Sequence, residues 1–154
     1  MKEQEYLSFM LEQEEYAVPI LLVREVRGWT PVRSVPNSPP FVVGVLEIRG
    51  EYVPIVDLRA RFNLSNTEIA PTTVVIVLNN SQHQPFGIIV DAVSEVYALT
   101  SQAIKSIPTI SAAMDDRFIE GIAPGQSGHL IIINLEALFD MQELSPLSIQ
   151  QALA

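Results

Sequence analysis

The chain has 154 residues, a net charge of −9 at pH 7 and a pI near 4.5. Such an acidic surface repels nucleic-acid phosphates and anionic lipid headgroups, which argues against binding along nucleic acid or adsorbing to anionic membranes. With 48% hydrophobic and 18% charged residues, the chain can bury a core, and its length fits one ordinary domain or two very small ones that share a core.

Further classes of protein are disfavoured by what the sequence lacks. It has no cysteine, which excludes disulfides, thiolate nucleophiles and thiolate metal sites. Residues 1–16 show no cationic region followed by an apolar stretch of signal-peptide length, and no apolar run approaches ~18 residues. We therefore expect a cytoplasmic protein that is neither secreted nor membrane-spanning.

Positive charge is concentrated in one segment of an otherwise acidic chain. Residues 24–61 hold six arginines and four acidic residues, a net charge of +2, whereas the rest of the chain carries three basic and 14 acidic residues, a net charge of −11. The six are Arg24, Arg27, Arg33, Arg49, Arg59 and Arg61. A single arginine usually decorates the solvent face of a strand, but a cluster of six is harder to explain in that way.

Seven short runs rich in β-branched and aromatic residues predict strands, and polar turns such as EQEE, NNSQHQ and APGQSG interrupt them. The runs are 6–11, 16–18, 42–48, 52–56, 73–78, 86–90 and 130–133. Many short strands at close spacing indicate a sandwich or barrel. Eleven prolines exclude long uninterrupted helices, and Pro54 within a predicted strand indicates an edge strand or a bulge.

Helices are predicted to be brief. After Asp57 and again after Asn134, the apolar spacing changes from that of a strand to that of a helix. The residues four apart on one helical face are Leu58 and Phe62, and Leu135 and Phe139. Asp57 and Asn134 are suitable N-caps, because a short side-chain acceptor can bond the free amides of a first helical turn. The C-terminal segment 141–154 is a candidate for one more helix.

Four segments recur in the same order, which indicates an internal repeat. YLSFML and YAVPILLVREV within 6–26 resemble TVVIVL and FGIIVDAVSEV within 73–96, FVVGV at 41–45 matches FIEGI at 118–122, and YVPIVDLRARF at 52–62 matches HLIIINLEALF at 129–139. We infer two similar small barrels, with repeat halves 6–62 and 73–139, that pack on one another because each alone has too small a core. Gly44 and Gly121 match, and each is expected to need a positive φ or a close backbone approach.

No pattern in the sequence indicates an enzyme. His83 and His129 lie in or beside loops without the spacing of a zinc site or a hydrolase. Asp57 and Asp91 have no second carboxylate or histidine at a spacing that forces pairing. Phosphate-binding and nucleophile-elbow motifs are absent from the sequence. We therefore expect no catalytic residues, no cofactor and no metal.

Several motifs together resemble one family. They are VREVRG at 23–28, PFVVGVLEIRG at 40–50, PIVDLRARF at 54–62, TVVIVL at 73–78 and GIIVDAVSEV at 87–96. The chain resembles the bacterial chemotaxis coupling proteins, the CheW family, over residues 5–140. The RGxxxPxxDLxxxF spacing is family-like, and GIIVDAVSEV is a second independent match.

The resemblance implies an all-β fold of two pseudo-repeated, intertwined, five-stranded SH3-like barrels with short helices and no catalytic activity. It implies an adaptor that joins the cytoplasmic tip of a methyl-accepting chemoreceptor to the regulatory domain of the chemotaxis histidine kinase. The main alternative is a β-barrel that binds a small ligand, although short strands leave little interior for a pocket.

The resemblance also assigns seven residues to partner contacts. Those matching positions associated with kinase or receptor are Val23, Glu25, Gly44, Arg49 and Val96, and those matching the edge associated with kinase docking are Tyr52 and Val74. For the apolar residues, core packing is the alternative interpretation. The guanidinium of Arg49 offers a rigid fork of donors that suits a carboxylate or backbone carbonyls of a partner. Glu47 stands where family members often have asparagine, which adds a negative charge near this surface.

Overall fold

The computed structural model describes residues 3–36, 41–62, 64, 69–106, 118–126 and 128–138. The first half contains β1 (Glu3–Leu11), β2 (Glu14–Pro19), the 3-10 helix η1 (Ile20–Leu22), β3 (Val23–Gly28), β4 (Val42–Ile48), β5 (Glu51–Asp57) and α1 (Leu58–Arg61). The second half contains β6 (Val74–Asn79), β7 (Pro85–Val90), β8 (Ala92–Thr100), the 3-10 helix η2 (Ser101–Ala103), β9 (Ile119–Gly125), β10 (Gly128–Ile133) and α2 (Leu135–Leu138).

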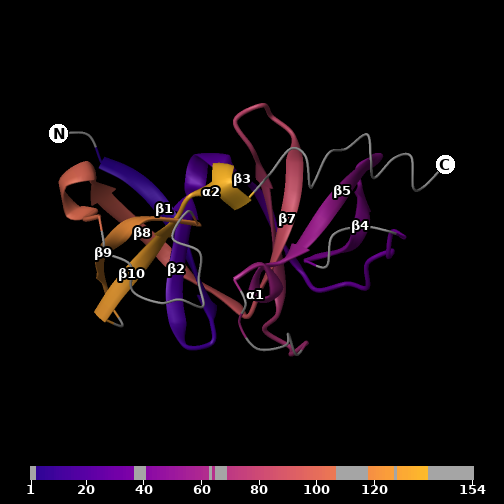
Figure 1. Cartoon of the computed structure of the whole chain (residues 1–154), viewed down its shortest axis with the longest axis horizontal. Helices are drawn as coiled ribbons and strands as arrows, with labels where there is room; N and C mark the ends of the chain where they lie inside the picture. Colours follow the sequence, from indigo (N-terminus) through magenta and orange to yellow (C-terminus); the bar gives the residue numbers. More distant parts are fainter. Residues whose placement is uncertain are drawn as a thin grey trace.

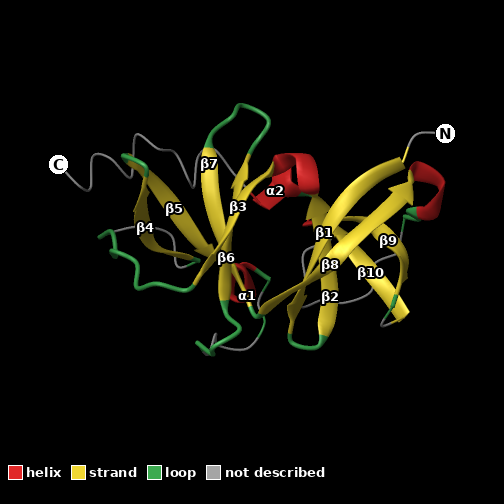
Figure 2. Cartoon of the chain, turned by 180° about the vertical axis from the view of Figure 1, so that it is seen from behind, coloured by secondary structure: helices red, strands yellow, loops and turns green. Residues whose placement is uncertain are grey.

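These strands form two five-stranded sheets that lie side by side along the long axis of the molecule (Figure 1). The first barrel has the strand order β8-β1-β2-β10-β9, and the second has the order β3-β6-β7-β5-β4. Both short α-helices lie between the two barrels, as the view from behind also shows (Figure 2). The predicted fold class, all-β with two five-stranded barrels and short helices, is confirmed.

Each barrel takes strands from both halves of the chain. The first combines β1 and β2 with β8, β9 and β10, and the second combines β6 and β7 with β3, β4 and β5. Replacing β1 to β5 by β6 to β10, and the reverse, converts one strand order into the other. The β2–β10 and β5–β7 pairs are parallel and also correspond. The two copies of the repeat are therefore exchanged, so that neither half contains all the strands of one barrel.

The sequence runs did not identify β3, β8 and β9 as separate strands. β3 (VREVRG) and β8 (AVSEVYALT) each have one neighbouring strand in their sheet, and β9 (IEGIAPG) contains glycine and proline. Strands at the ends of a sheet carry charged and small residues, so they lack the continuous apolar character that marks inner strands. Pro54 lies in β5, an inner strand, and pairs in regular register with Val45, so the edge or bulge expected at Pro54 is not found; the irregularity in this pair of strands lies on β4, between Val42 and Gly44.

The register corrects the repeat by two residues in the first hairpin. Phe9 pairs with Tyr16 in the first barrel, and Leu78 pairs with Phe86 in the second. The sequence comparison instead placed Leu11 opposite Leu78. The two alignments differ because β1 and β2 are joined by a two-residue turn, whereas a five-residue loop, 80–84, joins β6 and β7. In the corrected register, Val23 and Val93 match, as do Val26 and Val96.

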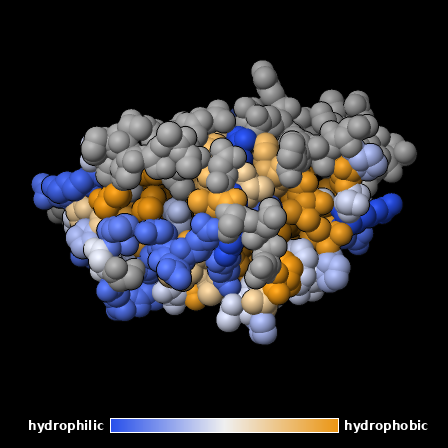
Figure 3. Space-filling model, turned by 60° about the horizontal axis from the view of Figure 1, so that its bottom comes forward, coloured by the Kyte–Doolittle hydropathy of each residue, from blue (hydrophilic) through white to orange (hydrophobic). Residues whose placement is uncertain are grey.

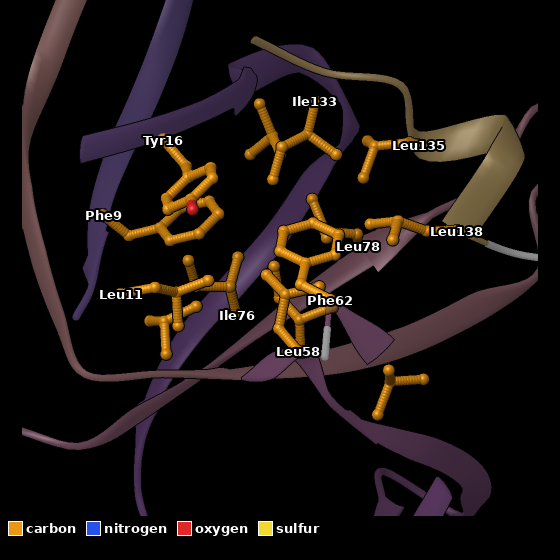
Figure 4. Packing of buried hydrophobic residues seen from close by; sticks show 14 of the residues in the cluster. Phe9, Leu11, Tyr16, Leu58, Phe62, Ile76, Leu78, Ile133, Leu135 and Leu138 are labelled. Carbon is orange, nitrogen blue, oxygen red and sulfur yellow. The ribbon is translucent and has the colours of Figure 1, made fainter. Parts of the chain in front are cut away.

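One large hydrophobic cluster joins the two barrels (Figure 4). Within it, the rings of Phe9 and Tyr16 lie 6.0 Å apart, those of Tyr16 and Phe62 5.7 Å apart, and those of Phe62 and Phe118 5.5 Å apart. Phe62 is buried, as the repeat predicted, and its counterpart Phe139 lies outside the described residues. Since this cluster draws on both barrels, each barrel completes the core of the other.

Gly44 and Gly121 allow the same close approach in the two barrels. A Cβ on Gly44 would overlap the backbone carbonyl of Arg33, and one on Gly121 would lie 2.6 Å from a methyl group of Ile104 and 2.7 Å from the carbonyl oxygen of Lys105. The expected close backbone approach is confirmed at both sites, whereas neither glycine has a positive φ. At these points another segment of the chain pairs with the strand that carries the glycine: Arg33 pairs with Val45 of β4, and Lys105 pairs with Ile122 of β9.

The cap predicted at Asp57 is present. Its Oδ1 accepts a hydrogen bond from the Arg59 N–H at 3.1 Å, at the start of α1. At the start of α2, the backbone carbonyl of Asn134 accepts from Ala137 at 3.2 Å. The candidate C-terminal helix, 141–154, lies outside the described residues.

Candidate functional site

The structure distributes the seven predicted contact residues over both barrels. Val23 and Glu25 lie in β3, Gly44 in β4, Arg49 between β4 and β5, Tyr52 in β5, Val74 in β6, and Val96 in β8. The first six therefore belong to the second barrel, and Val96 alone belongs to the first. The basic segment 24–61 also falls within the second barrel, so the arginine cluster and most of the predicted contact residues share one half of the molecule.

Arg49 stands at the tip of a tight hairpin. Ile48 pairs with Glu51, which leaves Arg49 and Gly50 as a two-residue turn with φ values of 52° and 84°. Positive φ at both central residues is typical of a type I′ turn, whose twist matches that of the flanking strands. Glycine adopts this conformation freely, but arginine does so at a cost of roughly 1 kcal/mol. The turn thus holds an exposed arginine outside the barrel, with a backbone conformation that residues other than glycine disfavour.

Tyr52 adds an exposed aromatic ring beside this turn. It is 46% exposed and pairs with Glu47 across β4 and β5. Next to Tyr52 in the chain, Glu51 has its Oε2 3.8 Å from Arg24 Nη1, which brings β3 close to the start of β5. Arg49 and Tyr52 therefore lie together on one hairpin, whereas Glu25, half-buried in β3, follows Arg24 and points to the opposite face of that strand.

Three of the seven residues have a structural role in this chain. Val23 and Val74 are partly buried and pack against the cluster that joins the barrels. Gly44 is buried, and its missing side chain makes room for the Arg33 carbonyl. A change in partner binding caused by substituting these residues would therefore include an effect on the fold. Arg49, Tyr52 and Val96 are exposed and free of that complication.

In the described part of the chain, three large exposed apolar residues lie outside the predicted set: Leu21, Val26 and Ile69. Val26, which matches Val96 in the repeat, is 44% exposed, and Val96 is 47% exposed. Leu21 is 88% exposed, in the turn η1. The sequence concealed Leu21 because it stands in an apolar run, PILLV, that normally indicates burial. For Val26 the internal repeat supplied a signal, since the tripeptides REV and SEV correspond.

Sequence analysis did not find a charged cluster at the junction of the barrels. Arg59 donates from Nε to Asp91 Oδ1 at 3.0 Å, from Nη2 to Asp91 Oδ2 at 2.6 Å and from Nη1 to Glu12 Oε1 at 3.3 Å. The Glu12 N–H also donates to Asp91 Oδ2, at 3.0 Å. These residues are 32 to 79 positions apart in the chain, so no local sequence pattern predicts that they form a cluster.

This cluster shifts the pKa values of Asp91 and Arg59. Burial raises the pKa of Asp91, but the hydrogen bond from Arg59, the Glu12 amide and the charge of Arg59 outweigh it, so the pKa lies below its ordinary value of 3.8. The hydrogen bond to Asp91, opposed by burial, raises the pKa of Arg59. The site is built to hold fixed charges rather than to exchange a proton near neutral pH. Asp57 and Asp91, the two aspartates considered for a hydrolase, make a helix cap and this ion pair.

Three of the six clustered arginines, Arg27, Arg59 and Arg61, are half-buried rather than exposed. Arg59 has 15% of its side chain exposed, and Arg61 lies over the ring of Phe41, with Cζ 4.0 Å from its centroid. Arg24, Arg33 and Arg49 are exposed. On the face shown in Figure 3, hydrophilic side chains gather mainly over the half occupied by the first barrel, and apolar patches appear over the centre and the second barrel.

Three hollows on the described part of the surface are lined by none of the predicted contact residues. One of about 440 Å³ on the first barrel is lined by Gln4, Tyr6, Leu99, Ser101, Ile104, Ser106 and Glu120. His129 pairs with Glu14 at 2.9 Å. Among the residues that the structure describes, no group of three or more histidine and acidic side chains is placed to hold a metal ion, and no helix is long and apolar enough to cross a membrane.

Comparison with known proteins assigns the chain to a family. The model of the CheW-like domain matches residues 5–143. The chain is 38% identical to a chemotaxis protein CheW of Klebsiella aerogenes over 142 residues, covering 92% of this chain and 85% of the relative. It is 36% identical to a probable chemotaxis protein CheW of Rhizobium etli over 141 residues, covering 92% and 90%.

A solved structure agrees with these sequence relatives. The crystal structure of the scaffolding protein TtCheW from Thermoanaerobacter tengcongensis superposes with a TM-score of 0.84 at 30% identity, covering 96% of this chain and 94% of that chain. Sequence and fold therefore lead to the same conclusion: this chain belongs to the CheW family of chemotaxis proteins.

Proposed function

We propose that this protein is a non-enzymatic cytoplasmic adaptor that couples methyl-accepting chemoreceptors to the chemotaxis histidine kinase. It would bind the cytoplasmic tip of the receptor and the regulatory domain of the kinase, without inserting into the membrane and without binding nucleic acid. Its membership of the CheW family supports this proposal, because a solved relative is described as a scaffolding protein.

The observation that carries the proposal is the pair of matched, exposed valines. Val26 on β3 and Val96 on β8 stand at matching positions in the two barrels, each on the outward side of a strand that ends its sheet. A monomer gains nothing by exposing a valine at the same point of each barrel, whereas a helical partner that lies across both can bury the two together. A receptor tip built from helices suits this arrangement.

The second barrel provides a different kind of surface, suited to the kinase. Tyr52 supplies a rigid aromatic side chain and Arg49 a guanidinium, and both residue types are enriched where protein partners bind tightly. The nearby charges of Glu47 and Glu51 would restrict which partners fit, because a like charge opposite them is costly. The same domain thus offers an apolar face to one partner and a mixed aromatic and charged face to the other.

Reconstitution tests the proposal directly. Membranes carrying the receptor are sedimented with the kinase, with and without this protein, and the kinase in the pellet is measured. We expect the protein to increase the sedimented kinase, and Val96→Asp to abolish the increase. Ile69→Asp is the control for a charge on an exposed apolar residue, since Ile69 is 49% exposed and Val96 is 47% exposed. Because Val96 lies in β8 and Ile69 lies outside the strands, a thermal melt of each variant separates an effect on the fold from an effect on coupling. Sedimentation that does not depend on the protein would show that it is not the coupling component.

A small-ligand-binding barrel remains the second candidate function, but none of the contacts described above favours it. The hollow of about 440 Å³ is lined by a mixture of polar and apolar residues rather than by a mainly apolar wall. Thermal melts with small metabolites would separate the two functions, because a bound ligand raises the melting temperature.

A further inference from the structure

The two short helices connect the barrels in a reciprocal way. α1 follows β5 of the second barrel, and its Arg59 bonds to Glu12 in the β1–β2 turn of the first barrel. α2 follows β10 of the first barrel, and its Glu136 accepts from the Ser81 N–H at 3.1 Å and from the Ser81 hydroxyl at 3.0 Å, in the β6–β7 turn of the second barrel. Arg59 matches Glu136 in the repeat, and Glu12 and Ser81 stand at matching points of their hairpins.

The two contacts differ in strength. At the α1 junction, Arg59 forms a bidentate pair with Asp91 as well as the contact to Glu12, and it is largely buried. Bidentate, charge-assisted bonds that are shielded from water are among the strongest in proteins. At the α2 junction, one carboxylate takes two uncharged donors, and both Glu136 and Ser81 are exposed, so water competes for each bond.

The chain also crosses between the barrels differently at the two junctions. At the α1 junction, Asp91 is the single residue between β7 and β8, and it is the residue that Arg59 holds. At the other crossover, the three-residue turn η1 separates β2 from β3. Leu21 in that turn matches Asp91 in the repeat, yet it is 88% exposed and has no carboxylate to offer. The α2 junction therefore has the weaker side-chain contact, and its crossover has no carboxylate that the helix could hold.

We propose that the Glu136–Ser81 contact is a latch that opens in the folded protein, while the cluster of Arg59, Asp91 and Glu12 stays closed and serves as the pivot. The hydrophobic cluster shared by the barrels keeps them together, so the opening is a small rotation about Asp91 and not a separation. A partner that lies across both barrels would change the balance between the latched and unlatched states. The motion itself requires no partner, and it stands whether or not the adaptor function does.

Amide hydrogen exchange on the intact wild-type chain tests whether the Glu136–Ser81 contact opens more readily than the cluster of Arg59, Asp91 and Glu12. The Glu12 and Ser81 amides form a matched pair, because each donates to a carboxylate from the same point of its hairpin, at 3.0 and 3.1 Å. After correction for intrinsic rates, we expect the Ser81 amide to exchange about tenfold faster or more, along with the α2 amides of Ala137 and Leu138. Equal protection of Glu12 and Ser81 would overturn the proposal.

A distance measurement tests the rotation. The chain has no cysteine, so Glu47→Cys on β4 and Glu120→Cys on β9 provide two exposed spin-label sites, one on each barrel. Glu136→Ala should broaden the distribution of distances, and Ser81→Ala should broaden it in part. Glu14→Ala is the control, because it removes an exposed contact of 2.9 Å to His129 within the first barrel. If the distribution for Glu136→Ala is as narrow as that for Glu14→Ala, the latch does not exist.

Discussion

Phe41 and Phe118 stand at matching points of the two repeats, and the guanidinium of Arg61 lies against both rings. Its Cζ is 4.0 Å from the centroid of Phe41 and 4.9 Å from that of Phe118. The Phe41 carbonyl accepts from the Asp57 N–H at 2.8 Å, and the Phe118 carbonyl accepts from the Asn134 N–H at 2.9 Å. One arginine therefore joins corresponding residues of both repeats, at the centre of the molecule.

Removing that arginine should weaken the whole fold. We expect Arg61→Ala to lower the free energy of unfolding by about 1–2 kcal/mol, because it loses contacts with two aromatic rings and the packing of its aliphatic stem. Denaturant melts provide the measurement. Arg24→Ala should stay within about 0.5 kcal/mol of wild type, because its contact with Glu51, 3.8 Å long, is exposed. Equal small losses in both variants would mean that Arg61 contributes no more than a surface arginine.

The Arg59–Asp91 pair should make stability depend on pH in a defined direction. Because the folded-state pKa of Asp91 lies below its ordinary 3.8, the folded protein binds this proton less tightly than the unfolded chain. The contribution is therefore complete above about pH 4 and is lost as the pH falls through the lowered pKa. Asp91→Asn should cost about 1 kcal/mol or more near pH 7, and this gap should narrow below about pH 3. Urea melts from pH 7 to acid measure it, and a gap that stays constant over this range would contradict the assignment.

The cap at Asp57 should contribute a similar amount for a different reason. Asp57→Ala removes the acceptor of the Arg59 N–H and should cost about 1 kcal/mol in denaturant melts. Asp57→Ser retains a short acceptor and should recover most of the loss. If alanine and serine behave alike, the capping bond has little energetic weight and the aspartate serves another purpose.

Gly44 should be far less tolerant of a side chain than its position in a strand suggests. A Cβ at Gly44 overlaps the Arg33 carbonyl, a backbone atom that cannot turn aside, so Gly44→Ala should cost about 3 kcal/mol or prevent folding. Gly28→Ala is the matched control, because nothing lies within 4 Å of the added methyl group, and it should stay within about 1 kcal/mol of wild type. The two thermal melts settle the comparison. Similar melting of both variants would show that the second barrel expands easily at its closure.

The sequence predicted the features of this fold that depend on local pattern. Runs of apolar residues located the inner strands, and the repeated Asp/Asn-Leu-x-Ala motif located both helices with the Asp57 cap. Neither the apolar runs nor the repeated motif predicted that the two halves of the chain exchange strands. A repeated sequence has the same pattern whether each half forms its own barrel or contributes strands to both barrels. The ion pair of Arg59 and Asp91 was not predicted for a similar reason, because these residues are 32 positions apart and come together only where the chain crosses between the barrels.

Part of the candidate site was equally beyond the reach of pattern. The backbone of Arg49 provides an example, since RG at the end of a strand indicates a turn but does not fix the φ of the arginine. Val23 and Val74 look like Val96 in sequence, yet they pack against the shared cluster while Val96 faces solvent. Burial of a valine near the middle of the molecule depends on how the two barrels meet, which no single segment encodes.

Arg49 allows a test in which stability and partner binding are expected to diverge. Its φ of 52° is a conformation that alanine also disfavours, so Arg49→Ala should keep the strain of the turn and leave the free energy of unfolding within about 0.5 kcal/mol of wild type. Glycine adopts this conformation freely, so Arg49→Gly should raise the free energy of unfolding by about 0.5–1 kcal/mol.

Both Arg49 variants lose the guanidinium, so both should weaken assembly of kinase with receptor to the same extent. Their stabilities should nevertheless differ, because Arg49→Ala is expected to be about as stable as wild type and Arg49→Gly more stable. Loss of a well-formed charged contact at an interface costs about 2 kcal/mol or more, which corresponds to about a 30-fold loss in affinity. A pull-down of kinase with receptor, run beside a melt of each variant, gives both readouts. Reduced coupling in alanine and glycine variants alike would assign the effect to the side chain, because backbone strain and stability differ between them. Wild-type coupling in both would make Arg49 an ordinary surface residue that happens to occupy a strained turn.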